Sequence, residues 1–174
     1  QIGRDKRTLV LVLVIPIMQL FLLGYAATND VRNVPLAVYD QDRGPEARLL
    51  LEAYRAADYF TIAYDVNSEE ELSALIDGGQ ARAGLIIPPE YGEKVLGGEP
   101  AQVMFILDGS DPTVASTALS AAKLIGQAYS TQVLEEKLMK TGQAAAIQPP
   151  VEVSTNVWYN PDLVSAHFMI PGVI

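Results

Sequence analysis

An uncharged apolar run near the amino end constrains this chain more than any other feature. Residues 9–27 read LVLVLVIPIMQLFLLGYAA and contain no charged side chain. As an α-helix the run would extend about 28 Å, close to the roughly 30 Å hydrocarbon thickness of a bilayer, whereas a strand of this length would be far longer than usual. We therefore predict a transmembrane helix over 9–27.

Two residues inside the predicted span favour packing against other helices. Pro16 lacks a backbone N–H and is expected to kink the helix, and Gln19 is its one strongly polar side chain. A glutamine in hydrocarbon either bonds to a neighbouring helix or is tolerated singly, and both alternatives stay open. Positions expected to lie within the hydrocarbon include Leu9, Val12, Pro16, Gln19 and Leu23.

The charges around the run predict its orientation. Three basic residues and one acidic residue give 1–8 a net charge of +2, which leaves −11 for the rest of a chain whose formal net charge is −9. The positive-inside rule then places 1–8 in the cytoplasm and the acidic remainder outside. The residues expected at the membrane interfaces on either side of this span are Arg4, Lys6, Arg7 and Tyr25.

A cleavable signal peptide is the rival interpretation of the same segment, because a basic segment precedes the apolar run and small residues, Gly24, Ala26 and Ala27, lie near its end. The run is longer than the roughly 7 to 15 residues usual in signal peptides. The chain also begins with Gln1, from which we expect it to be part of a longer protein. A second apolar stretch, 166–174, is predicted to open another membrane helix.

Between the two apolar segments, residues 28–165 alternate β-rich runs with helical patterns, as βαβ units do. The pattern predicts an α/β domain whose mixed, mainly parallel sheet of about five strands is covered by helices. The predicted strands are 34–39, 61–66, 83–87, 102–107 and 151–158.

Helix signals fall between these strands. Pro45 opens a predicted helix over 46–57 whose apolar spacing favours burial of Leu49, Leu50, Ala53, Tyr54 and Ala57. A second helix is expected from Asn67 or Ser68 to Gly78, and a short one after Pro89. The longest, 113–140, begins after Asp111 and Pro112, a favourable N-cap and first helical residue.

The composition excludes several classes of function. An acidic body without a basic patch argues against nucleic-acid binding, and the chain has no cysteine for disulfides or thiolate metal sites. The common nucleotide-binding, acyl-transfer and zinc-protease motifs are missing, so we expect no enzyme activity and no cofactor in this chain. The one histidine, His167, is expected at an interface.

Two pairs of polar residues follow predicted strands and are weak candidates for ligand binding or docking. Asp40 and Asp42 could hold a cation, but they more simply form a turn and cap the helix near Pro45. Asp108 and Ser110 lie at another strand end, where open parallel sheets bind ligands, beside Asp111, the predicted N-cap of the next helix. Trp158 and Tyr159 precede the second apolar stretch, where aromatic rings favour the headgroup layer, although Trp158 fits the core equally well.

Two segments, 30–43 (DVRNVPLAVYDQDR) and 159–172 (YNPDLVSAHFMIPG), together with the basic segment and first span, resemble ABC-2 type transporter permeases. The resemblance implies a large extracytoplasmic domain between the first and second membrane helices of a protein in the bacterial inner, or cytoplasmic, membrane. Such a permease contacts membrane lipid and dimerises, alone or with a sister permease. It couples to a separate cytoplasmic ATPase that binds ATP and Mg²⁺.

The implied function is ATP-driven efflux, in which the domain would serve gating, adaptor docking or substrate admission. Relatives in double-membrane bacteria often work with a periplasmic adaptor protein. The rival functions are a membrane-anchored extracytoplasmic sensor or ligand-binding domain with two spans, and an envelope hydrolase, which lacks a paired nucleophile and base here.

Overall fold

The computed structural model describes residues 14–22, 32–141 and 151–159 of a chain that divides between Asp30 and Val31 into two compact units. In the first unit, residues 14–22 form an α-helix with exposed side chains. Among the described residues, no helix combines the length and the hydropathy needed to cross a membrane. The other residues of the predicted span, and those of 1–8 and 166–174, lie outside the described ranges.

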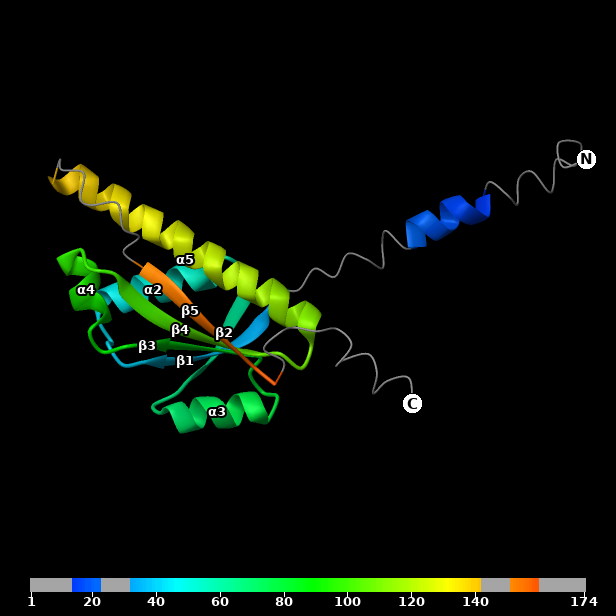
Figure 1. Cartoon of the computed structure of the whole chain (residues 1–174), viewed down its shortest axis with the longest axis horizontal. Helices are drawn as coiled ribbons and strands as arrows, with labels where there is room; N and C mark the ends of the chain where they lie inside the picture. Colours follow the sequence, from blue (N-terminus) through cyan, green and yellow to red (C-terminus); the bar gives the residue numbers. More distant parts are fainter. Residues whose placement is uncertain (1–13, 23–31, 142–150, 160–174) are drawn as a thin grey trace, which may run out of the picture. The chain divides into compact units, whose positions relative to one another are not determined.

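The second unit alternates strands and helices from beginning to end, as the sequence predicts (Figure 1). Its elements are β1 (Val34–Asp40), α2 (Pro45–Ala56), β2 (Phe60–Asp65), α3 (Glu69–Asp77), β3 (Ala83–Ile87), α4 (Tyr91–Gly97), β4 (Ala101–Asp108), α5 (Pro112–Thr141) and β5 (Val151–Trp158).

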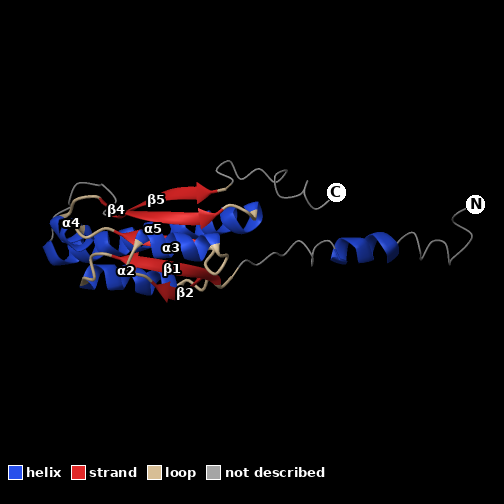
Figure 2. Ribbon diagram, turned by 90° about the horizontal axis from the view of Figure 1, so that it is seen from below, coloured by secondary structure: helices blue, strands red, loops and turns tan. Residues whose placement is uncertain are grey.

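The five strands form one sheet in the order β2-β1-β3-β4-β5. β1 is parallel to both β2 and β3, and β5 is parallel to β4, but β4 runs antiparallel to β3. In Figure 2 the arrowheads of β4 and β5 accordingly point to the same end of the unit. The prediction of a mixed, mainly parallel five-stranded sheet is confirmed.

Local capping explains where the helices begin and end. The Ser68 hydroxyl accepts a hydrogen bond from the Glu71 N–H at 3.2 Å, and the Glu71 carboxylate accepts one from the Asn67 N–H at 2.9 Å. These reciprocal bonds satisfy backbone donors that α3 leaves unpaired. α3 then ends at Gly78. At the start of α5, Asp111 accepts hydrogen bonds from the N–H groups of Thr113 and Val114, at 2.9 and 3.2 Å.

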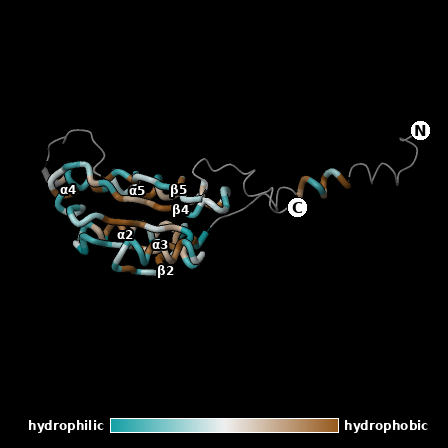
Figure 3. The backbone as a smooth tube through the Cα atoms, turned by 60° about the horizontal axis from the view of Figure 1, so that its bottom comes forward, coloured by the Kyte–Doolittle hydropathy of each residue, from teal (hydrophilic) through white to brown (hydrophobic). Residues whose placement is uncertain are grey.

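Helices cover both faces of the sheet, with α2, α4 and α5 on one face and α3 on the other (Figure 1). The larger core lies under the first three helices, where the rings of Tyr54, Phe60 and Phe105 pack with centroids 5.2 to 5.8 Å apart. The buried Tyr54 hydroxyl donates to the Ala122 carbonyl at 3.1 Å, which joins α2 to α5. The most hydrophobic segments accordingly follow the strands (Figure 3).

Four of the five residues that the sequence predicts to be buried in the α2 segment pack into the core or against it, including the partly buried Ala53 and Ala57. Leu50 and Tyr54 are fully buried as expected, but Leu49 is 47% exposed, and Ala47 and Leu51 are buried instead. The spacing of apolar residues along the helix fits the predicted and the observed buried sets equally well, because both contain Leu50 and Tyr54. The contact with the sheet and α5 selects the stripe centred on these two residues, which leaves Leu49 beside a groove.

The smaller core lies between the sheet and α3. Leu72 and Ile76 from α3 pack against Ala37 and Ile106 from the sheet. Trp158, at the end of β5, is partly buried against the same cluster. In this structure Trp158 therefore helps to close the α3 side of the sheet.

The contact between α5 and β5 yields a test of this packing. A Cβ on Gly126 would lie 2.3 Å from the Val153 Cγ2 atom, closer than packing allows. Gly126→Ala should therefore destabilise the domain by about 1–3 kcal/mol, although alanine ordinarily stabilises a helix relative to glycine. Urea unfolding followed by the fluorescence of the one tryptophan, Trp158, measures the change.

Two further variants separate the packing effect from helix propensity. A Cβ on Gly97 meets no atom within 4 Å, so Gly97→Ala should not destabilise the domain. Val153→Ala should reduce the cost of Gly126→Ala by removing the clashing methyl groups. Equal effects of the two glycine substitutions would contradict the described contact between α5 and β5.

Candidate functional site

The strand register places the start of β1 and the end of β5 at the same end of the sheet. Leu36 of β1 pairs with Ala83 of β3, Ala83 pairs with Leu107 of β4, and Leu107 pairs with Val157 of β5. β1 begins two residues before this row, and β5 ends one residue after it. The chain therefore joins the sheet and leaves it at one end, which we call the junction end; the opposite end, where α4 lies, is the distal end.

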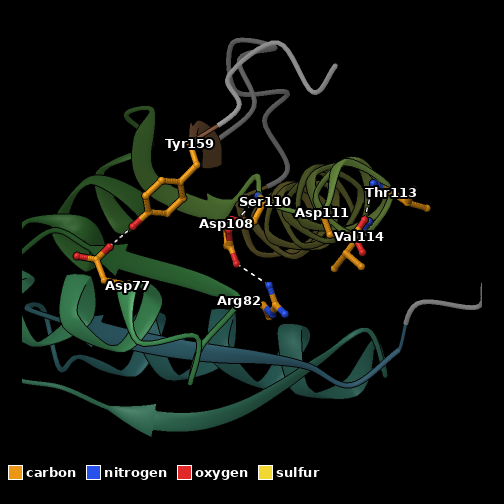
Figure 4. Close-up of polar contacts among 8 residues, drawn as sticks. All are labelled: Asp77, Arg82, Asp108, Ser110, Asp111, Thr113, Val114 and Tyr159. Carbon is orange, nitrogen blue, oxygen red and sulfur yellow. Dashed lines mark hydrogen bonds and ion pairs between the residues drawn. The ribbon is translucent and has the colours of Figure 1, made fainter. Parts of the chain in front are cut away.

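An ion pair braces the junction end (Figure 4). Asp108, the last residue of β4, is 7% exposed, and its Oδ2 atom accepts a hydrogen bond from Arg82 Nη1 at 2.7 Å. Its Oδ1 atom accepts from the Ser110 N–H at 2.9 Å. Burial opposes ionisation of this carboxyl group, but the hydrogen bonds from Ser110 and Arg82 outweigh it, so the pKa of Asp108 is lowered. The site thus holds a stable carboxylate.

Backbone hydrogen bonds tie the same strands together. The Arg82 N–H donates to the Pro35 carbonyl at 2.9 Å, and the Asp108 N–H donates to the Arg82 carbonyl at 3.0 Å. The Gly109 N–H donates to the Trp158 carbonyl at 2.9 Å. These bonds connect β1, β3, β4 and β5 in sequence, so the first and last strands are fixed relative to each other.

A tyrosine links the end of β5 to the helix on the α3 face. The Tyr159 hydroxyl donates a hydrogen bond to the Asp77 carboxylate, in the last turn of α3, and this bond raises the pKa of Tyr159 (Figure 4). The Tyr159 side chain is 61% exposed, and its φ of 67° is a backbone conformation that non-glycine residues rarely adopt. The chain therefore leaves the sheet through a sharply defined turn.

The other predicted pair, Asp40 and Asp42, lies at the distal end. Asp40 Oδ1 accepts hydrogen bonds from the N–H groups of Asp42 and Arg43 at 3.1 and 2.9 Å, which confirms the predicted turn. Asp42 accepts from the Gly44 N–H and from the Gly92 N–H, both at 3.1 Å. The sheet thus separates the two pairs of candidate ligands.

Asp42 does not cap α2, contrary to the prediction. Gly44 is the N-cap of α2 and forms no side-chain capping bond, whereas Gly92 lies in the first turn of α4. Asp42 reaches this helix because β1 and β3 are parallel neighbours, so the loops that follow them lie side by side at the distal end. In open α/β sheets this crevice commonly binds ligands. Here the Asp42 carboxylate bonds within its own loop and to the first turn of α4, and a Cβ on Gly92 would lie 3.1 Å from its Oδ2 atom.

The described residues present little that resembles a catalytic or metal centre. In residues 14–22, 32–141 and 151–159, no group of three or more His, Cys, Asp or Glu side chains is placed to hold a metal ion. The carboxylates of Asp40, Asp42 and Asp108 bond instead to Arg82 or to backbone N–H groups. The arrangement serves to fix strands and loops in place.

Comparison with known proteins decides the family. The sequence pattern of the family described as "ABC-2 family transporter protein" matches residues 6–174. The chain belongs to the ABC-2 transporter family. In Escherichia coli K12 it is 28% identical to a protein named "Probable multidrug ABC transporter permease YbhS", over 100% of this chain and 45% of that protein. It is 27% identical to the similarly named YbhR, over 98% of this chain and 44% of that protein.

A solved structure shares the fold of this ABC-2 family chain. It is a domain assigned to an ABC type-2 transporter from Thermotoga maritima MSB8, and it matches with a TM-score of 0.55 at 19% identity. The match covers 71% of this chain and 85% of that one. At this identity the likeness establishes the fold alone. The chain spans less than half the length of the two E. coli relatives.

Sequence reasoning missed Arg82 and the bond between Tyr159 and Asp77. Arg82 has no neighbouring motif, and its partner Asp108 lies 26 residues away. The antiparallel pairing of β3 with β4 would have revealed this ion pair, because it places the start of β3 beside the end of β4. Tyr159 was predicted at a membrane interface, and its partner on α3 lies 82 residues away.

Removal of either partner should weaken the junction end. Arg82→Gln should cost about 1 kcal/mol of unfolding free energy, because Asp108 keeps its bonds from Ser110, and Asp108→Asn should cost about 1–2 kcal/mol. Urea unfolding at pH 7, with Lys123→Gln as a control at an exposed position on α5, measures both changes. Equal stability of all four proteins would contradict the proposed brace.

The ion pair should also give the domain a specific acid dependence. A carboxyl group whose pKa is lowered by folding stabilises the protein above its unfolded pKa, about 3.9, and loses this contribution as pH falls through its lower folded value. The difference in stability between the wild type and Asp108→Asn should therefore stay constant near neutral pH and shrink below about pH 4. A difference that grows on acidification would contradict the lowered pKa of Asp108.

Proposed function

We propose that this chain is the first membrane span and the extracytoplasmic domain of an ABC-type exporter permease, and that the domain gates the outward path. The span would lie within 9–27, and the acidic domain would face the periplasm or the outside of the cell. A separate cytoplasmic ATPase would supply the energy, with a second copy or a sister permease completing the membrane part.

The observation that carries this proposal is the common junction end of the first and last strands. A domain inserted between two consecutive membrane helices must begin and end on the same side of the membrane. From β1 across β3 and β4 to β5 there are three strand spacings, or about 14 Å. Packed helices lie about 8–10 Å apart, so two neighbouring spans can reach both strands through the short segments 28–33 and 159–165.

The composition of the amino-terminal unit supports a membrane position. In the helix 14–22, Leu20 and Phe21 are 72% and 79% exposed. Exposed apolar side chains in such density are costly in water and favourable in lipid. The basic residues of 1–8 and the acidic remainder favour a cytoplasmic amino end. The names of the E. coli relatives, which describe multidrug ABC transporter permeases, agree with an exporter.

Gating is favoured over a sensor role by the way the strand ends are built. The crevice after β1 and β3, where a ligand would be expected, holds the Asp42 carboxylate and its two backbone bonds. The junction end instead carries the ion pair of Arg82 with Asp108 and the bond of Tyr159 with Asp77. A domain whose first and last strands are fixed to each other would move as one body when the proposed spans move.

Accessibility labelling tests the membrane position. These 174 residues contain no cysteine, so once any cysteine elsewhere in the full-length permease is replaced by serine, Leu124→Cys, at a position 65% exposed on α5, reports on the domain alone. In spheroplasts that contain the full-length permease, a membrane-impermeant maleimide should label Leu124→Cys before lysis. Gln1→Cys should react after lysis alone. Labelling of Leu124→Cys only after lysis would place the domain in the cytosol and refute the proposal.

An efflux measurement tests the function. Cells that express the full-length permease with its ATPase should export a cationic dye such as ethidium faster than cells with an ATPase-dead partner. The combined variant Asp108→Asn and Tyr159→Phe should lower this export several-fold at unchanged permease abundance, because the strands at the junction end are less firmly fixed. Full export by a folded double variant would refute the gating role.

A further inference from the structure

A groove at the side of the domain is not explained by gating. Its walls are α2 and the carboxyl-terminal half of α5, and α4 closes its distal end. The hollow has a volume of about 600 Å³. Its apolar surface comes from Leu49, Ala53, Ala56, Val95, Leu96 and Val133. We call this hollow the α2–α5 groove.

The groove exposes large apolar side chains that packing within the domain leaves uncovered. Leu49 is 47% exposed and Leu96 is 66% exposed. Just beyond the groove, Met139 on the last turns of α5 is 84% exposed. Contiguous exposed apolar surface bordered by polar residues is typical of a protein interaction site.

Carboxylates border the apolar surface on both walls. Glu46 and Glu52 come from α2, and Glu136 comes from α5. In the described part of the chain, neither Glu46 nor Glu52 has a cationic side chain as an ion-pair partner. Glu46 and Glu136 act on the same residue, Tyr129, in the floor of the groove. Burial, with a further contribution from the negative charges of Glu46 and Glu136, raises the pKa of Tyr129 to about 12.

Among the described residues that line the groove, Lys137 is the one cation, and it bonds within the domain. The Lys137 ammonium group donates hydrogen bonds to the carbonyls of Val95 and Leu96, the latter at 3.3 Å. These carbonyls belong to the last turn of α4, where a cation favours the negative end of the helix dipole. The groove thus presents acidic walls to an occupant.

The lining residues of each wall form a stripe along their own helix. On α2 the lining residues Glu46, Leu49, Ala53 and Ala56 follow the i, i+3, i+7, i+10 stripe, and Tyr129, Gln132, Val133 and Glu136 form the facing stripe on α5. The α2 stripe is about 15 Å long, or nearly three helical turns. An elongated apolar channel between two helices is how amphipathic helices are commonly bound.

We infer that the α2–α5 groove binds an amphipathic helix of a partner protein, with leucine-like residues on its buried face and lysine or arginine on its flanks. The apolar surface selects the buried face, and the Glu46 and Glu52 carboxylates of the α2 wall select the basic flanks. This inference depends on the proposed function only for the compartment in which the partner meets the domain. Its binding surface is separate from the junction end.

Binding of two matched peptides tests the inference on the full-length permease in lipid nanodiscs. The first probe is a synthetic helix of about four turns with leucines at helical spacing and lysines on both flanks, labelled with a fluorophore. The second has glutamate at every lysine position. Fluorescence anisotropy should show saturable binding of the lysine peptide that weakens with added salt, and much weaker binding of the glutamate peptide.

Variants of the groove should separate the two components of binding. The pair Glu46→Gln and Glu52→Gln should weaken the lysine peptide about fivefold and reduce its salt dependence. Leu49→Ser should weaken it about tenfold at every salt concentration. Leu124→Ser and Glu152→Gln, at exposed positions outside the groove, are the matched controls and should leave binding unchanged.

Four outcomes would overturn the inference. The first is equal binding of both peptides, and the second is an equal loss of binding in the control variants. The third is binding of the lipophilic cation tetraphenylphosphonium but not of the lysine peptide. The fourth is cross-linking of two permease copies through Leu49→Cys. The last two would assign the groove to a small molecule or to a second copy. Maleimide labelling of Leu124→Cys is unaffected by any of them, so failure here and failure of the proposed function remain distinguishable.

Discussion

The antiparallel pairing of β4 with β3 is the constraint on which the arrangement of this domain depends. β1, β2 and β3 all run away from the junction end, and parallel continuation would have left the chain at the distal end. Reversal at β4 turns the last two strands back, so that Val157 of β5 shares a row with Leu36 of β1. A domain with both connections on one side follows from this single reversal.

Carboxylates that might have bound ligands have structural roles at both ends of the sheet. Asp42 joins the loop after β1 to the first turn of α4, and Asp108 joins the end of β4 to Arg82 before β3. A buried or partly buried carboxylate is costly unless hydrogen bonds satisfy it, and both receive them from within the domain. Hydrogen bonds and an ion pair therefore fix the ends of the sheet, whereas apolar packing fixes its middle.

The elements could be predicted from the sequence because their signals are local. Alternating apolar residues mark the strands, and Ser68 and Asp111 mark helix starts within the next few residues. The direction of β4 leaves no such mark, because β3 is buried throughout and its apolar pattern suits either orientation. For the same reason Asp42 was assigned to the nearest helix, although its second partner, Gly92, lies 50 residues away. The candidate site is formed by contacts between segments far apart in the chain, and these contacts cannot be recognised in a single sequence.

The two ends of the domain are joined by one rigid element. α5 has 30 residues and so a length of about 45 Å, whereas the eight residues of β4 span about 26 Å. Its first turn is capped by Asp111 beside the junction end, and its far half forms one wall of the α2–α5 groove. The close contact of Gly126 with Val153 and the bond from Tyr54 to Ala122 hold its middle against β5 and α2. These contacts fix α5 to the sheet and α2 from the junction end to its middle, so the helix that forms one wall of the groove begins at the strands of the junction end.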